Sequence, residues 1–202
     1  MVASTPWQEI PLPGELATRL QAAYDLPQPP TTLGELAAAR VRTPTAVLSA
    51  ERLLSDAPTR HQVRTGDTTR YTHCAMDALL LPLLTGQPVT VRTRSPLGEH
   101  VTLEVTPETV TADAPEAVVS FGLARTDQGD VRQAVCPYLN VFPSRAAYER
   151  WAAATPEAVT IPLTLAEAFA FARALAARRE PSRRDGDGEG ACCRARPRDT
   201  TG

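Results

Sequence analysis

A cysteine and an aspartate stand three positions apart in the segment YTHCAMDALLLP, where Cys74 and Asp77 open a run of apolar residues. If a helix begins at Cys74, this spacing places both side chains on one face of it. A thiol at a helix N-terminus has its thiolate form favoured by the helix dipole. An aspartate one turn further on, among apolar residues, has its protonated form favoured by desolvation. The pair would then supply a soft nucleophile or metal ligand together with an acid.

The same residues also have a purely structural interpretation. A buried cysteine commonly packs as a small apolar side chain, and a Cys and an Asp at this spacing often occur by chance. A second thiol, Cys136, lies in DVRQAVCPYLNVF, whose apolar pattern predicts a strand. A packed thiol is the simpler interpretation there too. On these residues alone, catalysis and core packing both stay open.

The elements that would position these side chains begin with a helical domain over residues 1–65. Apolar residues at helical spacing predict short helices over residues 13–26, 29–40 and 43–56. Two short helices across a tight turn are typical of a helix-turn-helix. The region carries as many arginines as acidic residues, however, whereas a DNA reader normally has a positive face. Helical packing without DNA contact is therefore favoured.

Residues 66–179 are expected to form the core that carries the chemistry. A first helix should end at Gly86, and short segments rich in Val and Thr then predict the strands of a sheet. Two helices follow, one capped by Ser144 and one by Thr164 with Glu167 at the third helical position. Helices, strands and again helices in this order predict an α+β fold with a mixed sheet and flanking helices, not an alternating parallel sheet.

Residues 180–202 differ from the rest of the chain in composition. They are charged, Gly-rich and nearly free of large apolar residues, which predicts a disordered tail. This segment nevertheless contains the adjacent pair Cys192 and Cys193, half of the cysteines in the chain.

The overall charge excludes several classes of partner. A net charge of -2 and a pI near 5.9 provide no basic field for nucleic acid and no polybasic patch for a membrane. The sequence shows neither a secretory signal nor an apolar run of membrane-spanning length, so we expect a cytoplasmic protein. Its cysteines are then expected to be reduced thiols, and their spacing lacks the CxxC pattern of structural zinc sites.

From about Arg70 to Ala177 the chain resembles the organomercurial lyases, also called alkylmercury lyases. The resemblance lies in the order and spacing of YTHCAMDALLLPLLTGQPVTV, VTLEVTP, AVVSF, DVRQAVCPYLNVFPS and TLAEAFAFARAL. It places the family's first catalytic cysteine on Cys74 and the catalytic aspartate on Asp77, within C-A-x-D-x-L. The second catalytic cysteine falls on Cys136, within D-V-R-Q-x-x-C. The family's winged-helix-like domain in front of the catalytic core also fits the helices predicted for the N-terminal region.

The resemblance implies protonolysis of a carbon–mercury bond, which releases a hydrocarbon and leaves Hg(II), in mercury detoxification. Mercury(II) is a soft cation that prefers thiolates. Cys74 would be the first thiolate and Cys136 the second, while Asp77 would take a thiol proton and donate it to carbon. No organic cofactor is required, and Hg(II) is bound as product. The implied partners are an organomercurial substrate, low-molecular-weight thiols and a mercuric reductase that accepts Hg(II).

The chain departs from the family pattern after the second cysteine. Family members usually continue with a polar pair including His and then His-Phe-Phe, whereas this chain has PYLNVF, so the substrate range depends on an altered pocket. Ser95 stands near the position of a third, non-catalytic cysteine of many members, which we interpret as structural. His73 could raise the thiolate fraction or make a structural hydrogen bond. Tyr71 and Tyr138 could line the pocket or pack in the core.

Other functions remain compatible with the same residues. A non-enzymatic, thiol-based metal-binding or metal-responsive regulator on this fold would need soft ligands but no acid, so the presence of Asp77 argues against it. The fold could also serve another small-molecule or metal-binding task. Cys192 and Cys193 could accept Hg(II) from the site and pass it on, or could have no role in the chemistry.

Overall fold

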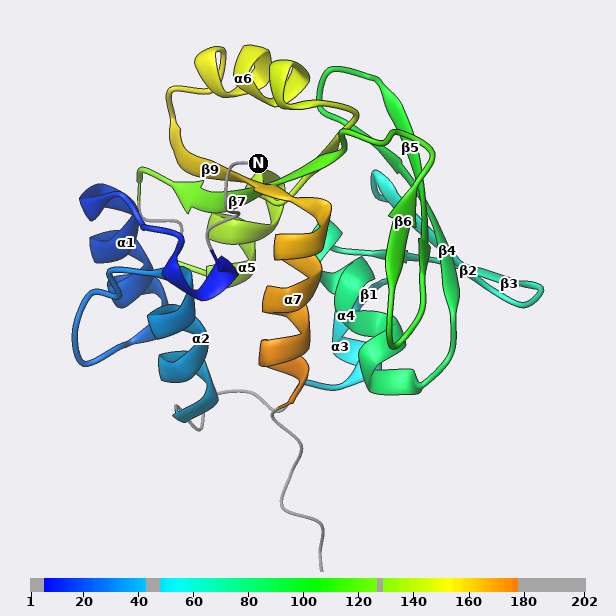
Figure 1. Ribbon diagram of the computed structural model, residues 1–202, viewed down its shortest axis with the longest axis horizontal. Coiled ribbons are helices and arrows are strands. Elements are labelled where there is room, and N and C mark those ends of the chain that lie inside the picture. The colour runs from blue at the N-terminus through cyan, green and yellow to red at the C-terminus, as the bar shows by residue number, and fades with distance from the viewer. Residues whose placement is uncertain (1–5, 43–47, 127–128, 178–202) are drawn as a thin grey trace, which may run out of the picture.

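A computed structural model of the protein describes residues 6–42, 48–126 and 129–177. Helices and antiparallel strands together make an α+β structure, which confirms the predicted fold class. Two sheets lie on different sides of the molecule, and helix α7 (Leu165–Ala176) stands between helix α2 (Leu33–Arg42) and helix α4 (Ala75–Thr85) (Figure 1). The site described below is built where these elements meet.

The larger sheet has six strands in the order β1-β3-β2-β4-β5-β6, all paired antiparallel. Inward and outward residues alternate along β4 and β5, as expected for a sheet with one buried face. The division predicted between residues 65 and 66 falls in the turn of the β2–β3 hairpin, and β2 pairs with β4 of the predicted core. The strands are β1 (Leu54–Ser55), β2 (His61–Thr65), β3 (Thr68–Thr72), β4 (Val89–Arg94), β5 (His100–Val105) and β6 (Val110–Ala112).

A second sheet of three strands has the order β8-β7-β9. Its central strand β7 (Val118–Ala124) is buried along its whole length, between β8 (Val141–Phe142) and β9 (Ala158–Thr164). Gly122 faces the backbone of β9 so closely that a Cβ there would lie 2.1 Å from the Val159 carbonyl oxygen. Only glycine therefore fits at this point of the sheet.

The N-terminal helices pack on the same apolar core as the sheets. Helix α1 (Gly14–Tyr24) and helix α2 (Leu33–Arg42) contribute residues such as Leu16, Leu20 and Leu36, all at most 1% exposed, to the cluster that also contains Phe171 of α7. A single 3-10 turn, η1 (Trp7–Glu9), precedes them. The N-terminal region thus shares its apolar core with the later part of the chain.

Helix ends largely follow the predicted capping residues. Helix α7 has the capping box of Thr164 and Glu167, and Ser144 caps helix α6 (Arg145–Ala153). At α2 only half of the predicted box forms: the Glu35 amide donates to Thr32 Oγ1, but the Glu35 carboxylate accepts from Thr31.

Two predicted elements were wrong. The helix expected over residues 43–56 is, in its described part, only the single turn α3 (Ala50–Leu53), because the chain turns directly into β1. The strand expected around Cys136 is instead helix α5 (Val131–Val135) followed by the 3-10 turn η2 (Cys136–Tyr138). Asp130 caps α5 with its side chain, and Pro137, which has no N–H for a strand ladder, suits a helical turn.

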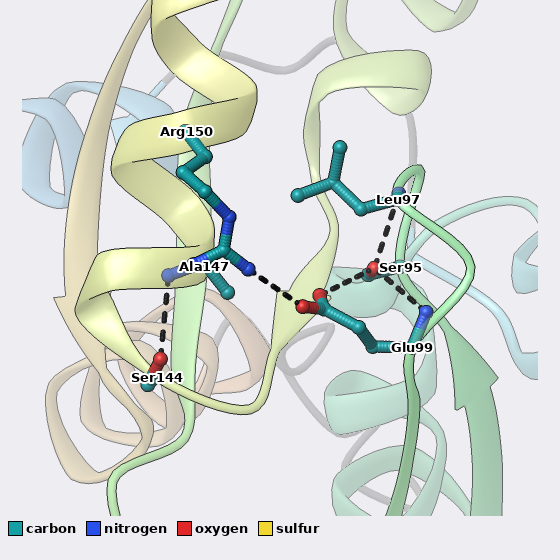
Figure 2. Close-up of polar contacts among 6 residues, drawn as sticks. All are labelled: Ser95, Leu97, Glu99, Ser144, Ala147 and Arg150. Carbon is teal, nitrogen blue, oxygen red and sulfur yellow. Dashed lines mark hydrogen bonds and ion pairs between the residues drawn. The ribbon is translucent and has the colours of Figure 1, made fainter.

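Ser95 holds the turn between β4 and β5 (Figure 2). Its hydroxyl accepts from the Leu97 and Glu99 amides at 3.1 and 3.3 Å and donates to the Glu99 carboxylate at 3.0 Å. Glu99 in turn pairs with Arg150 of α6 at 2.9 Å. Ser95 is 2% exposed, so this position organises a turn in this chain.

Within the described residues, no helix has both the length and the apolar character needed to cross a membrane. The predicted tail, residues 180–202 with Cys192 and Cys193, lies outside the described part of the chain.

Candidate functional site

Cys74 and Asp77 lie at the start of helix α4 (Ala75–Thr85), which follows directly on β3. Cys74 is the N-cap residue in an extended conformation and Asp77 lies in the first turn, as the three-residue spacing predicted. The backbone here is fixed from two sides: Thr72 Oγ1 donates to the Cys74 carbonyl at 3.1 Å, and the Ala75 amide donates to the Leu139 carbonyl at 3.0 Å. The second bond joins the start of α4 to the segment that carries Cys136.

Cys136 begins the turn η2, which the buried polar residues Ser120 of β7 and Asn140 hold in place. The hydroxyl of Ser120, a fully buried residue, donates to the Tyr138 carbonyl at 2.7 Å and accepts from the Asn140 amide at 3.0 Å. The Asn140 side chain donates to the Pro137 carbonyl at 2.8 Å. Because buried hydrogen bonds of this kind are costly to break, they fix the position of Cys136 opposite α4.

The structure brings the three predicted residues together. The two sulfur atoms of Cys74 and Cys136 and a carboxylate oxygen of Asp77 all lie within 4.8 Å of one another, and both cysteines are free thiols. Cys74 is 2% exposed, while Cys136 and Asp77 are half-buried. Two sulfurs and one carboxylate at this separation can contact a single soft metal ion.

Burial decides the protonation of the two groups on α4. It raises the pKa of the Cys74 thiol well above its ordinary value, and a hydrogen bond with Cys136 and the charge of Asp77 act in the same direction. The helix N-terminus was expected to favour the Cys74 thiolate; that expectation was wrong, because desolvation outweighs the dipole. Burial also raises the pKa of Asp77, from 3.8 to about 6, although a hydrogen bond from Cys74 and the charge of Arg132 oppose the rise. The predicted direction for Asp77 is confirmed.

The three groups open into a cavity of about 460 Å³. Its walls are mainly apolar, with Phe121 of β7 and Phe171 of α7 among them. Two residues of the N-terminal helices complete the wall, Tyr24 at the end of α1 and Arg40 on α2. The guanidinium group of Arg40 stacks over the Tyr24 ring, 4.0 Å from the ring centroid. Burial and the neighbouring site groups raise the pKa of Tyr24 to about 12. Tyr24 and Arg40 were not predicted as site residues, because only the packing of α1 and α2 on the core reveals them.

His73 makes a structural hydrogen bond at the edge of the site. Its Nε2 lies 2.9 Å from Arg132 Nη1, and Arg132 Nη2 donates to the Arg52 carbonyl at 3.1 Å. Partial burial and the Arg132 charge lower the pKa of His73, so it is neutral at neutral pH. Of the two possibilities left open for His73, the structural one fits these contacts.

The two tyrosines left open by the sequence do not line the cavity. Tyr71 lies on β3, and Tyr138 packs against the separate cluster of Phe142, Tyr148 and Trp151. Of the unusual segment after Cys136, only Leu139 reaches the cavity wall. The altered residues therefore change the support of the site more than its lining.

Comparison with known proteins identifies the family of the chain. The alkylmercury lyase family model, MerB, matches residues 54–177. An alkylmercury lyase of Staphylococcus epidermidis is 33% identical over 67% of this chain and 61% of its own length, and one of Streptomyces lividans is 30% identical over 72% of this chain and 75% of its own. The chain thus spans about 61% of the length of its Staphylococcus relative.

The fold is shared as well. The solved structure of the mercury-bound form of MerB2 superposes with a TM-score of 0.51 at 23% identity, covering 62% of this chain and 61% of that one. The segment matched by the family model contains Cys74, Asp77 and Cys136 and every strand of the two sheets. On this sequence evidence, the chain belongs to the alkylmercury lyase family.

Proposed function

We propose that the protein is an organomercurial lyase that cleaves the carbon–mercury bond by protonolysis, with Cys74, Cys136 and Asp77 as its catalytic residues. One observation carries the proposal: a carboxyl group whose pKa is raised to about 6 lies in the same 4.8 Å cluster as two free thiols. Soft-metal binding alone would require the thiols only. A carboxyl group that can hold a proton near neutral pH adds the means to deliver it.

The resting protonation states suit a proton relay. At neutral pH the Cys74 thiol keeps its proton, while Asp77 is mostly ionised and accepts a hydrogen bond from that thiol. When an alkylmercury cation binds the Cys74 sulfur, the thiol proton passes to Asp77. Because Cys74 is buried and Asp77 is half-buried, bulk water has limited access to this proton.

The second thiol then activates the bond. Attack of the Cys136 sulfur on mercury pushes electron density toward the metal-bound carbon, and its proton leaves to solvent. Asp77 donates its proton to the carbon as the carbon–mercury bond breaks. One R–Hg⁺ and two thiols thus give R–H, Hg(II) held by two thiolates, and one H⁺. Holding the three groups on one reacting unit supplies the effective concentration that free thiols lack.

The same proposal includes the surroundings of the reaction. Low-molecular-weight thiols would carry the substrate in and take Hg(II) out, and a mercuric reductase would be the final acceptor. We place the reaction in the cytoplasm, where thiols stay reduced. Cys192 and Cys193 would act, if at all, in this transfer: removing residues after Arg179 should slow Hg(II) release to an external thiol, and unchanged release would exclude the role.

The proposal is tested by following hydrocarbon release from phenylmercury in excess neutral thiol. Cys74→Ser, Cys136→Ser and Asp77→Ala should each remove most of the benzene formation, while Ser95→Ala, outside the cluster, should retain it. Benzene release that survives the loss of Cys136 would break the two-thiolate mechanism. Tight mercury binding without any benzene would favour a metal-binding or regulatory protein instead.

A further inference from the structure

The cavity that holds the cluster carries more positive than negative side chains on its walls. Arg40, Arg52 and Arg132 line it, against the two aspartates Asp77 and Asp130. Asp77 belongs to the reacting centre, and Asp130 is engaged as the cap of α5, where it accepts the Arg132 amide at 2.8 Å. Among the described residues neither carboxylate forms an ion pair with Arg40 or Arg52, while the charge of Arg132 acts on Asp77.

Arg40 and Arg52 have no ion-pair partner among the described residues. In the described parts of the chain, the ion pairs are Arg125–Glu15 and Arg150–Glu99, and both lie away from the cavity. Arg40 stacks on the Tyr24 ring, and within the described ranges it forms no ion pair with a carboxylate. Arg132 donates to the Arg52 backbone carbonyl at 3.1 Å, and its Nη1 lies 2.9 Å from His73 Nε2. A guanidinium group that has no ion-pair partner can bind a carboxylate through two parallel hydrogen bonds.

Two of these three arginines come from a part of the chain that the family match does not include. Arg40 is on α2 and Arg52 on α3, whereas the match begins at residue 54. Arg40 and Arg52 thus lie outside the matched segment, which contains the reacting groups and Arg132. A wall built on the N-terminal helices can set substrate preference while leaving the cluster itself unchanged.

We propose that this cationic wall selects organomercurials that carry a carboxylate. The inference rests on the proposed lyase function and specifies its substrate class. An aromatic or alkyl group would lie against the apolar wall near Phe121 and Phe171, and the carboxylate would face Arg40 and Arg52. The carboxylate can belong to the organic group that is cleaved or to the thiol that carries the mercury, and both present the same anion to the arginines.

The test compares three substrates on the full chain. The first is 4-(hydroxymercuri)benzoate with excess 2-mercaptoethanol, the second is phenylmercury with the same neutral thiol, and the third is phenylmercury with mercaptoacetate. Benzoate and benzene are measured as products. A higher kcat/KM for the first substrate than for the second assigns the carboxylate to the organic group, and a higher value for the third assigns it to the carrier thiol.

Arginine variants separate the effect of charge from the intrinsic reactivity of each mercurial. Arg40→Gln and Arg52→Gln should each lower the carboxylate-to-neutral ratio of kcat/KM by about two- to fivefold, the range of exposed ion pairs. Raising the salt concentration should lower the wild-type ratio in the same direction. Arg92→Gln is the matched control, because Arg92 is exposed on β4 and does not line the cavity; it should leave the ratio unchanged.

The possible failures are distinguishable. If the wild-type protein releases product from the neutral and the carboxylate substrates with equal kcat/KM, and neither arginine variant changes the ratio, the selection is refuted and the lyase function stands. If it releases product from none of the three, both proposals fail. Arg52 is exposed, so loss of folding would not account for an effect of its replacement.

Discussion

Replacing Asp77 by Asn should make the protein more stable at neutral pH while abolishing catalysis. Burial raises the pKa of Asp77 from 3.8 to about 6, so the folded protein opposes its ionisation. The resulting cost is absent below pH 3.8, grows as the pH rises toward 6, and is complete above that value. A shift of this size corresponds to about 3 kcal/mol, because each pKa unit is worth ~1.4 kcal/mol. Asparagine has a similar shape and carries no charge, so it removes the cost.

The assay is urea or thermal unfolding of the mercury-free, reduced protein between pH 4 and pH 8. Near pH 7.5 the melting temperature of Asp77→Asn should exceed that of the wild type by roughly 6–12 °C, given 2–4 °C per kcal/mol for a chain of this size. The difference should shrink toward zero near pH 4. Asp67→Asn, in the exposed β2–β3 turn, serves as the control and should show no such trend. A difference that is independent of pH, or a less stable Asp77→Asn at pH 7.5, would refute the inference that ionised Asp77 destabilises the fold.

Three further predictions concern the scaffold. Burial lowers the pKa of His61 from 6.5 to about 4. The free energy of unfolding should therefore be unaffected by this group above pH 6.5 and should fall by up to about 3 kcal/mol as the pH drops toward 4, because the unfolded chain takes up the proton first. His61→Asn should remove that pH dependence in unfolding experiments. Gly122→Ala should lower the free energy of unfolding by about 3 kcal/mol or more, because the added Cβ would lie 2.1 Å from the Val159 carbonyl oxygen. Gly14→Ala is the control and should leave stability unchanged, since a Cβ there has no atom within 4 Å. Ser95→Ala should cost about 1–3 kcal/mol of stability through its lost turn hydrogen bonds, with mercury binding unchanged by titration.

The sequence predicted the long amphipathic helices and the start of α4 well, because local signals specify them. Thr164 and Glu167 form the predicted capping box, and Gly86 ends α4 in the left-handed conformation that favours glycine. The strand predicted around Cys136 was wrong, since the five residues Val131–Val135 mix apolar and polar side chains and are too few to separate a strand from a helix. The observed conformation depends on the Asp130 cap and on the hydrogen bond that Ser120 of β7 donates to the Tyr138 carbonyl.

The candidate site shows the same division between local and long-range information. The spacing of Cys74 and Asp77 predicted that both lie at one end of a helix, but only the family resemblance joined Cys136 to them. Tyr24 and Arg40 could not be predicted as wall residues, because their place depends on how α1 and α2 pack against α7 and β7. The protonation of Cys74 was likewise misjudged, since burial is a property of the folded chain.

The source of the proton delivered to carbon is the most direct test of the account. In a single turnover with phenylmercury in D2O, the fully exchanged wild-type protein should form monodeuterated benzene, one per active site, with Hg(II) retained on Cys74 and Cys136. Asp77→Ala, with both thiols intact, should bind phenylmercury and form little or no benzene. Benzene formed by Asp77→Ala at the wild-type rate, or mercury bound by the wild type with the phenyl group still attached, would contradict the proposed proton transfer from Asp77.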